Sequence, residues 1–176
     1  MPAKSSLLLG AALASFATQA SAFCFAPEPT YEICYTTANG ATPQNVTLQE
    51  IAYVAGYLRY YGKQKGNPQF YTMNLPDADN CAEWQVTTKG STLVLAKLIG
   101  DDAASVTFDD IANTIDGGAS ATPAQKAAAL YGCGTAGGQV GVAINATDPR
   151  YQQPQFTNGT YTNQGVIIKI VRNPGL

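Results

Sequence analysis

Catalysis by this chain would have to rely on carboxylates. The sequence contains no histidine, which removes the Ser-His-Asp triad, the Cys-His dyad and ordinary zinc catalysis together. Acidic side chains occur at Asp77, Asp79 and Glu83 and in the pairs Asp101-Asp102 and Asp109-Asp110. Glycoside hydrolysis needs two carboxyl groups that face each other across a cleft, and adjacent acids on a helix point in different directions. We therefore expect no catalytic residue, and a carboxylate-dependent secreted hydrolase acting on polysaccharide is the alternative.

Aromatic side chains are better candidates for a binding site. Flat ligands such as sugar rings stack on aromatic faces while their polar edges form hydrogen bonds. The candidate ligand-binding residues are Tyr53, Tyr57 and Tyr60 on one face of an expected helix, and Tyr151, Phe156 and Tyr161 in a late loop. Each group has a structural alternative: the helix tyrosines could pack under the segment 63–80, and the loop aromatics could fold back onto the sheet.

The four cysteines predict a disulfide-stapled domain. Their even number favours two bridges in an oxidising compartment, and four cysteines allow three connectivities. The segment 27–30 is typical of a turn, and Cys24 and Cys34 lie symmetrically about it. We therefore favour Cys24–Cys34 with Cys81–Cys133. A zinc site is the rival use of cysteines, but the sequence lacks C-x-x-C and histidine, so we expect no metal.

The first 22 residues have the order of a secretory signal peptide. Lys4 gives the positive end, residues 7–16 form a short apolar run, and Ala20-Ser21-Ala22 is a small-residue cleavage site. The apolar run is shorter than the roughly 20 residues that cross a bilayer. We expect a single secreted, extracellular domain over residues 23–176 with no membrane span.

The composition of the chain narrows the classes of molecule that are expected to bind it. The formal net charge is −2 and only 12% of the residues are charged, so nucleic acid is not an expected partner. No cofactor motif is expected either. Three sequons predict glycosylation at Asn45, Asn145 and Asn158. The expected partner is an extracellular glycan or a host protein, and the expected state is a monomer.

The order of elements predicts an α+β fold. A helix over 48–62 begins at a Thr47/Glu50 capping box, and Leu48, Ile51, Ala55 and Leu58 are expected to face the core. A loop over 63–80, strands over 81–88 and 92–99, and helices over 107–116 and 122–132 follow, then strands over 139–145 and 166–171 joined by a loop over 146–164. This order favours a mostly antiparallel sheet with two or three helices packed on one face.

The chain resembles small secreted cysteine-containing fungal effector proteins. The resemblance rests on the signal peptide, the four cysteines and the segments Cys81-Ala-Glu-Trp84, Val106-Thr-Phe-Asp-Asp-Ile-Ala and Gly132-Cys133-Gly134. A weaker likeness to killer-toxin-like α/β sandwich proteins rests on Leu130-Tyr-Gly-Cys133 and the β-branched run over 165–171; those toxins carry more cysteines. The resemblance implies an extracellular virulence protein that acts on a host or competitor.

These observations together favour a secreted, non-enzymatic binding protein of effector type. The alternatives are the carboxylate-dependent hydrolase and a structural cell-wall or surface protein. An aromatic-lined open surface would favour binding, whereas a cleft holding two facing carboxylates would favour the enzyme.

Overall fold

The computed structural model describes residues 28–78 and 82–175. The expected signal peptide, Cys24, Asp79 and Cys81 lie outside these residues. The helices are α1 Leu48–Tyr61, α2 Phe108–Asp116, α3 Pro123–Ala127 and α4 Pro154–Thr157. The strands are β1 Ile33–Cys34, β2 Phe70–Met73, β3 Glu83–Lys89, β4 Thr92–Leu98, β5 Ala104–Thr107, β6 Gly138–Gly141 and β7 Val166–Arg172, and short 3-10 helices cover Thr37–Asn39, Leu130–Ala136 and Pro149–Gln152.

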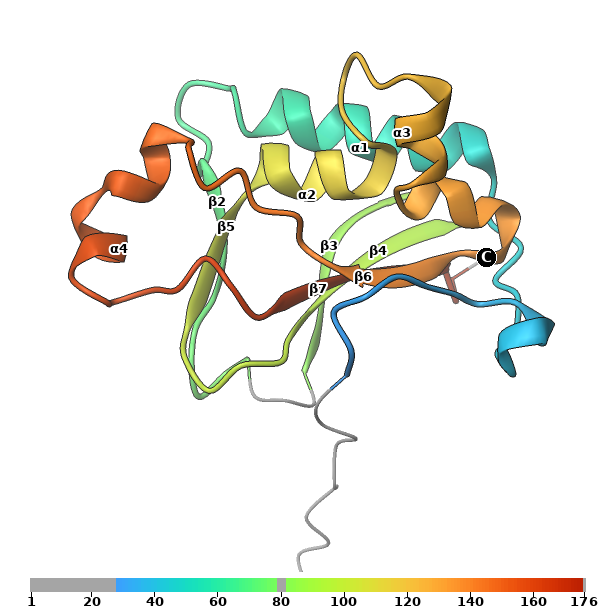
Figure 1. Cartoon of the computed structure of the whole chain (residues 1–176), viewed down its shortest axis with the longest axis horizontal. Helices are drawn as coiled ribbons and strands as arrows, with labels where there is room; N and C mark the ends of the chain where they lie inside the picture. The colour runs from blue at the N-terminus through green and yellow to red at the C-terminus, as the bar shows by residue number, and fades with distance from the viewer. Residues whose placement is uncertain (1–27, 79–81, 176) are drawn as a thin grey trace, which may run out of the picture.

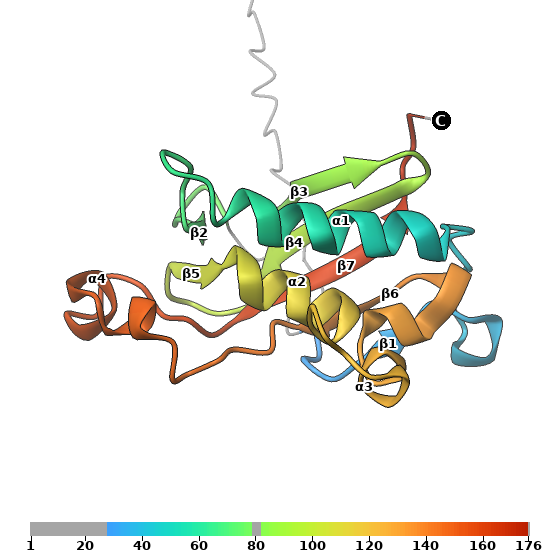
Figure 2. The same cartoon turned by 90° about the horizontal axis from the view of Figure 1, so that it is seen from above.

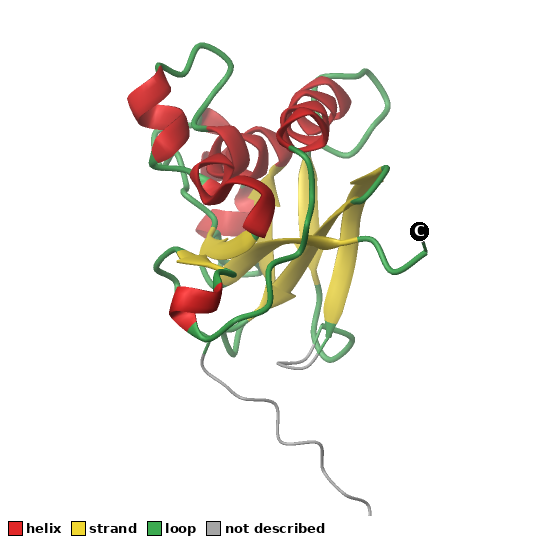
Figure 3. Ribbon diagram, turned by 90° about the vertical axis from the view of Figure 1, so that its right-hand side faces the viewer, coloured by secondary structure: helices red, strands yellow, loops and turns green. Residues whose placement is uncertain are grey.

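An antiparallel five-stranded sheet forms one layer. Its strand order is β1-β6-β7-β4-β3, and every neighbouring pair is antiparallel. The short strands β2 and β5 pair with each other in a second sheet. Helices α1 and α2 lie side by side over one face of the large sheet (Figures 1 and 2), and Figure 3 shows most of the helices on that side. The expected α+β fold is therefore confirmed.

The core lies between the helices and the two central strands. The paired residues Val94 and Ile170, and the next pair Ala96 and Ile168, are fully buried. From α1, Ile51, Val54, Ala55 and Leu58 join the same cluster, as do Ile111 and Ile115 of α2. Apolar side chains at every second position of the strands therefore pack against apolar side chains at every third or fourth position of the helices.

Side-chain caps fix the starts of three helices. The Thr47 hydroxyl accepts a hydrogen bond from the Glu50 N–H at 3.2 Å, and Thr107 caps α2 in the same way. Thr122 and Gln125 form a complete capping box at α3. These caps satisfy backbone N–H groups that the first turn leaves unpaired, and they confirm the predicted helix starts.

Several predicted boundaries are wrong. Leu48 is 39% exposed and lies outside the core. The expected loop over 63–80 contains β2, and β5 was not expected; both strands have four residues and pair only with each other among the described strands. The helix expected to reach Gly132 ends at Ala127 and is followed by the 3-10 helix over Leu130–Ala136. There the chain passes so close to the Ala127 carbonyl that a side chain on Gly132 would collide with it.

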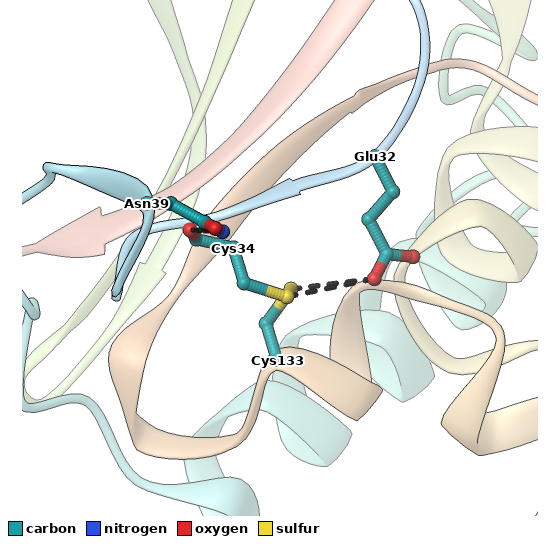
Figure 4. The surroundings of a disulfide bond; sticks show 4 residues. All are labelled: Glu32, Cys34, Asn39 and Cys133. Carbon is teal, nitrogen blue, oxygen red and sulfur yellow. Dashed lines mark hydrogen bonds between the residues drawn. A yellow bond between two sulfur atoms is a disulfide. The ribbon is translucent and has the colours of Figure 1, made fainter. Parts of the chain in front are cut away.

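The disulfide joins Cys34 to Cys133, so the favoured pairing of Cys24–Cys34 with Cys81–Cys133 is wrong. Cys34 lies opposite Gly138 at the sheet edge, and the 3-10 helix over Leu130–Ala136 brings Cys133 to the same edge (Figure 4). Sheet pairing across 99 residues of sequence, rather than symmetry about a local turn, selects the partner. On the loop-entropy estimate a bridge over such a loop stabilises the fold by about 4–5 kcal/mol.

Membrane crossing by a helix needs roughly 20 residues. Within residues 28–78 and 82–175 no helix meets the length and hydropathy that a membrane span requires.

Candidate ligand-binding groove

Three tyrosines of α1 remain open to solvent. Tyr53, Tyr57 and Tyr60 are 52%, 40% and 62% exposed. They lie on the side of the helix away from Ile51, Ala55 and Leu58. Tyr53 and Tyr57 border hollows in the surface, and Tyr60 is not among the residues that line them. The structure therefore divides this predicted group into two groove residues and one outlying residue.

Two adjoining hollows form a groove between α1 and β3. The first, of about 370 Å³, is lined by residues of α1, β2 and β3 and by Phe108. The second, of about 350 Å³, is lined by Tyr53, Tyr57 and residues 85–89 of β3. Because both include Tyr57 and Val86, we treat them as one surface, the aromatic groove. Its aromatic residues are Tyr53, Tyr57, Tyr61, Phe70, Tyr71 and Phe108, and its polar residues are Thr72, Gln85, Thr87, Thr88 and Lys89.

Contacts between rings hold the aromatic wall in place. Tyr57 and Tyr61 have ring centroids 6.0 Å apart. The Phe108 ring forms T-shaped pairs with Tyr61, at 5.0 Å between ring centroids, and with Tyr71, at 6.1 Å. Tyr61 and Tyr71 are half-buried against the core, so these rings are positioned before any ligand arrives. Such edge-to-face pairs stabilise the arrangement beyond the area they bury.

The groove is close to neutral. Burial raises the pKa of Tyr71 to about 12, so its phenol stays uncharged at ordinary pH. None of the residues lining the groove is a carboxylate. The one cation is Lys89, whose ammonium lies 4.8 Å from the centre of the Tyr53 ring in a cation–π contact.

Glu50 fixes the distance between the two walls. Its carboxylate accepts hydrogen bonds from the Ser91 N–H and hydroxyl at 3.2 and 2.6 Å, and from the Thr92 hydroxyl. The bonds from Ser91 hold the pKa of Glu50 below its ordinary value. Gly90 has φ of +50°, and a side chain there would collide with the Glu50 carboxylate. The β3–β4 turn is therefore tied to the first turn of α1.

The second predicted group is brought together in the late loop, where Tyr151 acts as an anchor. Tyr151 is 5% exposed; its hydroxyl donates to Asp110 at 2.6 Å and accepts from the Thr107 N–H at 2.9 Å. Its ring contacts Phe156 edge-on at 5.1 Å. Phe156 and Tyr161 are half-buried and line a hollow of about 340 Å³ with Tyr151. Most of the Tyr151 surface is thus unavailable to a ligand.

The predicted glycosylation sites lie outside the groove. Asn45, Asn145 and Asn158 are all exposed, and none of them is among the residues that line the aromatic groove. The predicted glycosylation sites are therefore not part of the groove wall.

Several carboxylates are engaged in ion pairs or buried hydrogen bonds. Arg150 binds Asp109 at 2.9 Å and Asp148 at 2.6 Å, and Lys169 binds Glu83 at 2.6 Å. Asp110, 2% exposed, accepts from Tyr151 and from the Asn145 N–H. These acids serve to hold loops and strands together.

Four aromatic residues of the groove were not predicted from the sequence: Tyr61, Phe70, Tyr71 and Phe108. Phe70 and Tyr71 belong to the run Phe-Tyr-Thr-Met, which has high strand propensity, and this run was the available signal. No family model, no curated protein and no solved structure matches the chain. Function must therefore be argued from the groove.

Proposed function

We propose that the protein is a secreted, non-enzymatic binding protein and that the aromatic groove is its ligand site. The observation that carries the proposal is a fixed row of partly exposed tyrosines beside neutral polar groups. If the protein is an effector, as the sequence resemblance favours, the groove attaches it to the surface of a host or competitor cell. The Cys34–Cys133 disulfide is consistent with an oxidising compartment.

The placement of the acids supports binding over hydrolysis. A glycosidase presents two carboxyl groups on opposite sides of a substrate cleft. Neither hollow of the groove, nor the hollow at Phe156, has a carboxylate in its lining. The groove offers a ligand aromatic faces, hydroxyls and one ammonium, which suit recognition.

Binding to intact cells tests the proposal. Fluorescently labelled secreted protein is incubated with washed plant and fungal cells, and bound protein is measured against concentration. We expect saturable binding that the double variant Tyr53→Ala/Tyr57→Ala weakens at least about tenfold, equivalent to about 1.4 kcal/mol. Tyr60→Ala is the matched control, since Tyr60 is an exposed tyrosine of the same helix outside the groove. Equal binding by the double variant and the wild type would remove the groove from the proposal.

A further inference from the structure

We infer that the ligand of the aromatic groove is an extended, neutral glycan chain, stacked along a row of three tyrosines of α1; the inference rests on the proposed function. The row consists of Tyr53, Tyr57 and Tyr61, which are spaced four residues apart in the sequence. Residues at this spacing lie above one another on a helix, about 6 Å apart along its axis. The tyrosine row therefore runs parallel to the helix.

The row and the groove share one direction. Tyr53 lines the hollow beside the end of β3, Tyr57 lines both hollows, and Tyr61 lines the hollow beside β2. The centroids of the Tyr57 and Tyr61 rings lie 6.0 Å apart, comparable with the length of one sugar ring in a chain. Successive sugar rings of an extended glycan would thus meet successive tyrosines.

The opposite wall offers groups that suit sugar hydroxyls. Thr87 of β3 lines the hollow that faces Tyr53 and Tyr57, and it pairs with the buried Val94, so its side chain lies on the helix side of the sheet. Its hydroxyl donates and accepts hydrogen bonds and carries no charge. Aromatic faces on one side and neutral hydrogen-bonding groups on the other match the two kinds of surface that a sugar ring presents.

The charge of the groove lining favours a neutral glycan over an acidic one. A chain of uronic acids or sulfated sugars presents one or more negative charges per repeat, and its recognition calls for several cations along the path. The groove lining contains one cation, Lys89, at the end where it contacts the Tyr53 ring. A neutral chain fits this distribution better.

The edge of the sheet argues against an extended peptide. β3 is an edge strand of the large sheet, and a peptide strand that paired with it would need a regular ladder of backbone N–H and C=O groups. The register of β3 shifts between Gln85 and Thr87, at Val86, where the two hollows meet. Such a bulge interrupts strand pairing and protects edges from it.

Calorimetric titration of the secreted protein with defined oligosaccharides tests the inference. The probes are neutral β-linked glucose and N-acetylglucosamine oligomers of increasing length, a galacturonic acid oligomer, and an extended peptide as comparison. We expect a neutral oligomer to bind more tightly as it lengthens, with little change between about 0.05 and 0.5 M salt, since no ion pairs are formed. Tyr57→Ala should weaken it about tenfold, and Tyr60→Ala should not.

Three outcomes would overturn the inference. Binding of the galacturonic acid oligomer alone, lost at high salt and in Lys89→Gln, would assign an acidic ligand. Binding of the peptide alone would assign strand addition at β3. Failure of every probe, while cell binding still depends on Tyr53 and Tyr57, would reject the glycan but keep the proposed function; if cell binding is also insensitive to those tyrosines, both are rejected.

Discussion

The phenol of Tyr151 joins two buried polar groups, the Asp110 carboxylate and the Thr107 N–H, and so holds the late loop against the start of α2. Its pKa is raised by burial first and by the neighbouring Asp110 second, so the hydroxyl keeps its proton and remains a donor. A tyrosine in a loop rich in polar residues resembles a binding residue in the sequence. Burial and hydrogen bonding instead assign it a structural role.

Tyr151→Phe should lower the free energy of unfolding by about 1–3 kcal/mol, because the variant leaves a buried carboxylate and a buried N–H each short of a partner. Denaturant unfolding measures the change. Tyr161→Phe is the control, since Tyr161 borders the same hollow but is only half-buried, and it should change stability by less than about 0.5 kcal/mol. A Tyr151→Phe variant of unchanged stability that loses cell binding would show that this residue contacts ligand instead.

At the scale of elements, the hydrogen bonds from the β3–β4 turn to Glu50 of α1 hold the two walls of the groove together before a ligand binds. Glu50→Ala removes the acceptor for Ser91 and Thr92. We expect faster hydrogen exchange at the Ser91 amide and weaker binding of the same cells, since the walls must then be ordered on binding. Amide exchange measured by NMR checks the first effect, and Glu50→Gln, which keeps an acceptor, should lie between Ala and wild type.

The Glu50 link should also respond to acid. The pKa of Glu50 is lower in the folded state than its ordinary value, so the link is complete above that ordinary value and is lost as the pH falls through the folded pKa. Exchange at the Ser91 amide should therefore lose its protection in acid, and protection that persists in Glu50→Ala would show that another contact holds the turn.

Elements with their own local signals were predictable from the sequence. Caps and helical spacing predicted α1 and α2, and the long apolar strands β4 and β7 were predicted within a residue or two. The pair β2 and β5 was not, because strands of four residues acquire their identity from each other across 30 or more residues. Only two of the six aromatic groove residues were predicted, for the same reason: Tyr53 and Tyr57 share a helix face, whereas Tyr71 and Phe108 belong to elements that only the fold brings beside that helix.

For the molecule as a whole, the helix-free side of the sheet carries a network of opposite charges that fastens the chain before β1 to the central strands. Glu28 contacts Lys97 of β4 and, at 2.8 Å, Lys169 of β7, and Lys169 also contacts Glu83 of β3. Both lysines are buried. Tyr35 lies close enough for Glu28 and Glu83 to add to the effect of burial in raising its pKa. It is therefore a neutral phenol beside the network, and its hydroxyl donates to Gln139 at 2.8 Å.

This network should make stability depend on acid. Burial alone would raise the pKa of Glu28, but hydrogen bonds and charge from Lys169 and Lys97 outweigh it, and the pKa lies below its ordinary value. The pKa of Lys169 is raised, because Glu28 and Glu83 outweigh the opposing effect of burial. A carboxylate whose pKa is lowered on folding stabilises the fold at pH values above its unfolded-state pKa, about 4.3. A lysine whose pKa is raised on folding stabilises the fold at pH values below its unfolded-state pKa, about 10.4. The network is therefore complete between those limits.

Glu28→Gln should remove much of the acid sensitivity. In the wild type the free energy of unfolding is expected to fall as the pH drops from about 5 through the folded pKa of Glu28, because protonation leaves two buried ammonium groups with one fewer counter-ion. The variant is less stable near neutral pH, and its free energy of unfolding should decline less over the same interval. Denaturant unfolding at a series of pH values checks both effects, with Glu32→Gln as the control from the same segment, since Glu32 faces the disulfide rather than the lysines. If Glu28→Gln and the wild type lose the same stability on acidification, Glu28 does not fasten this segment to the sheet.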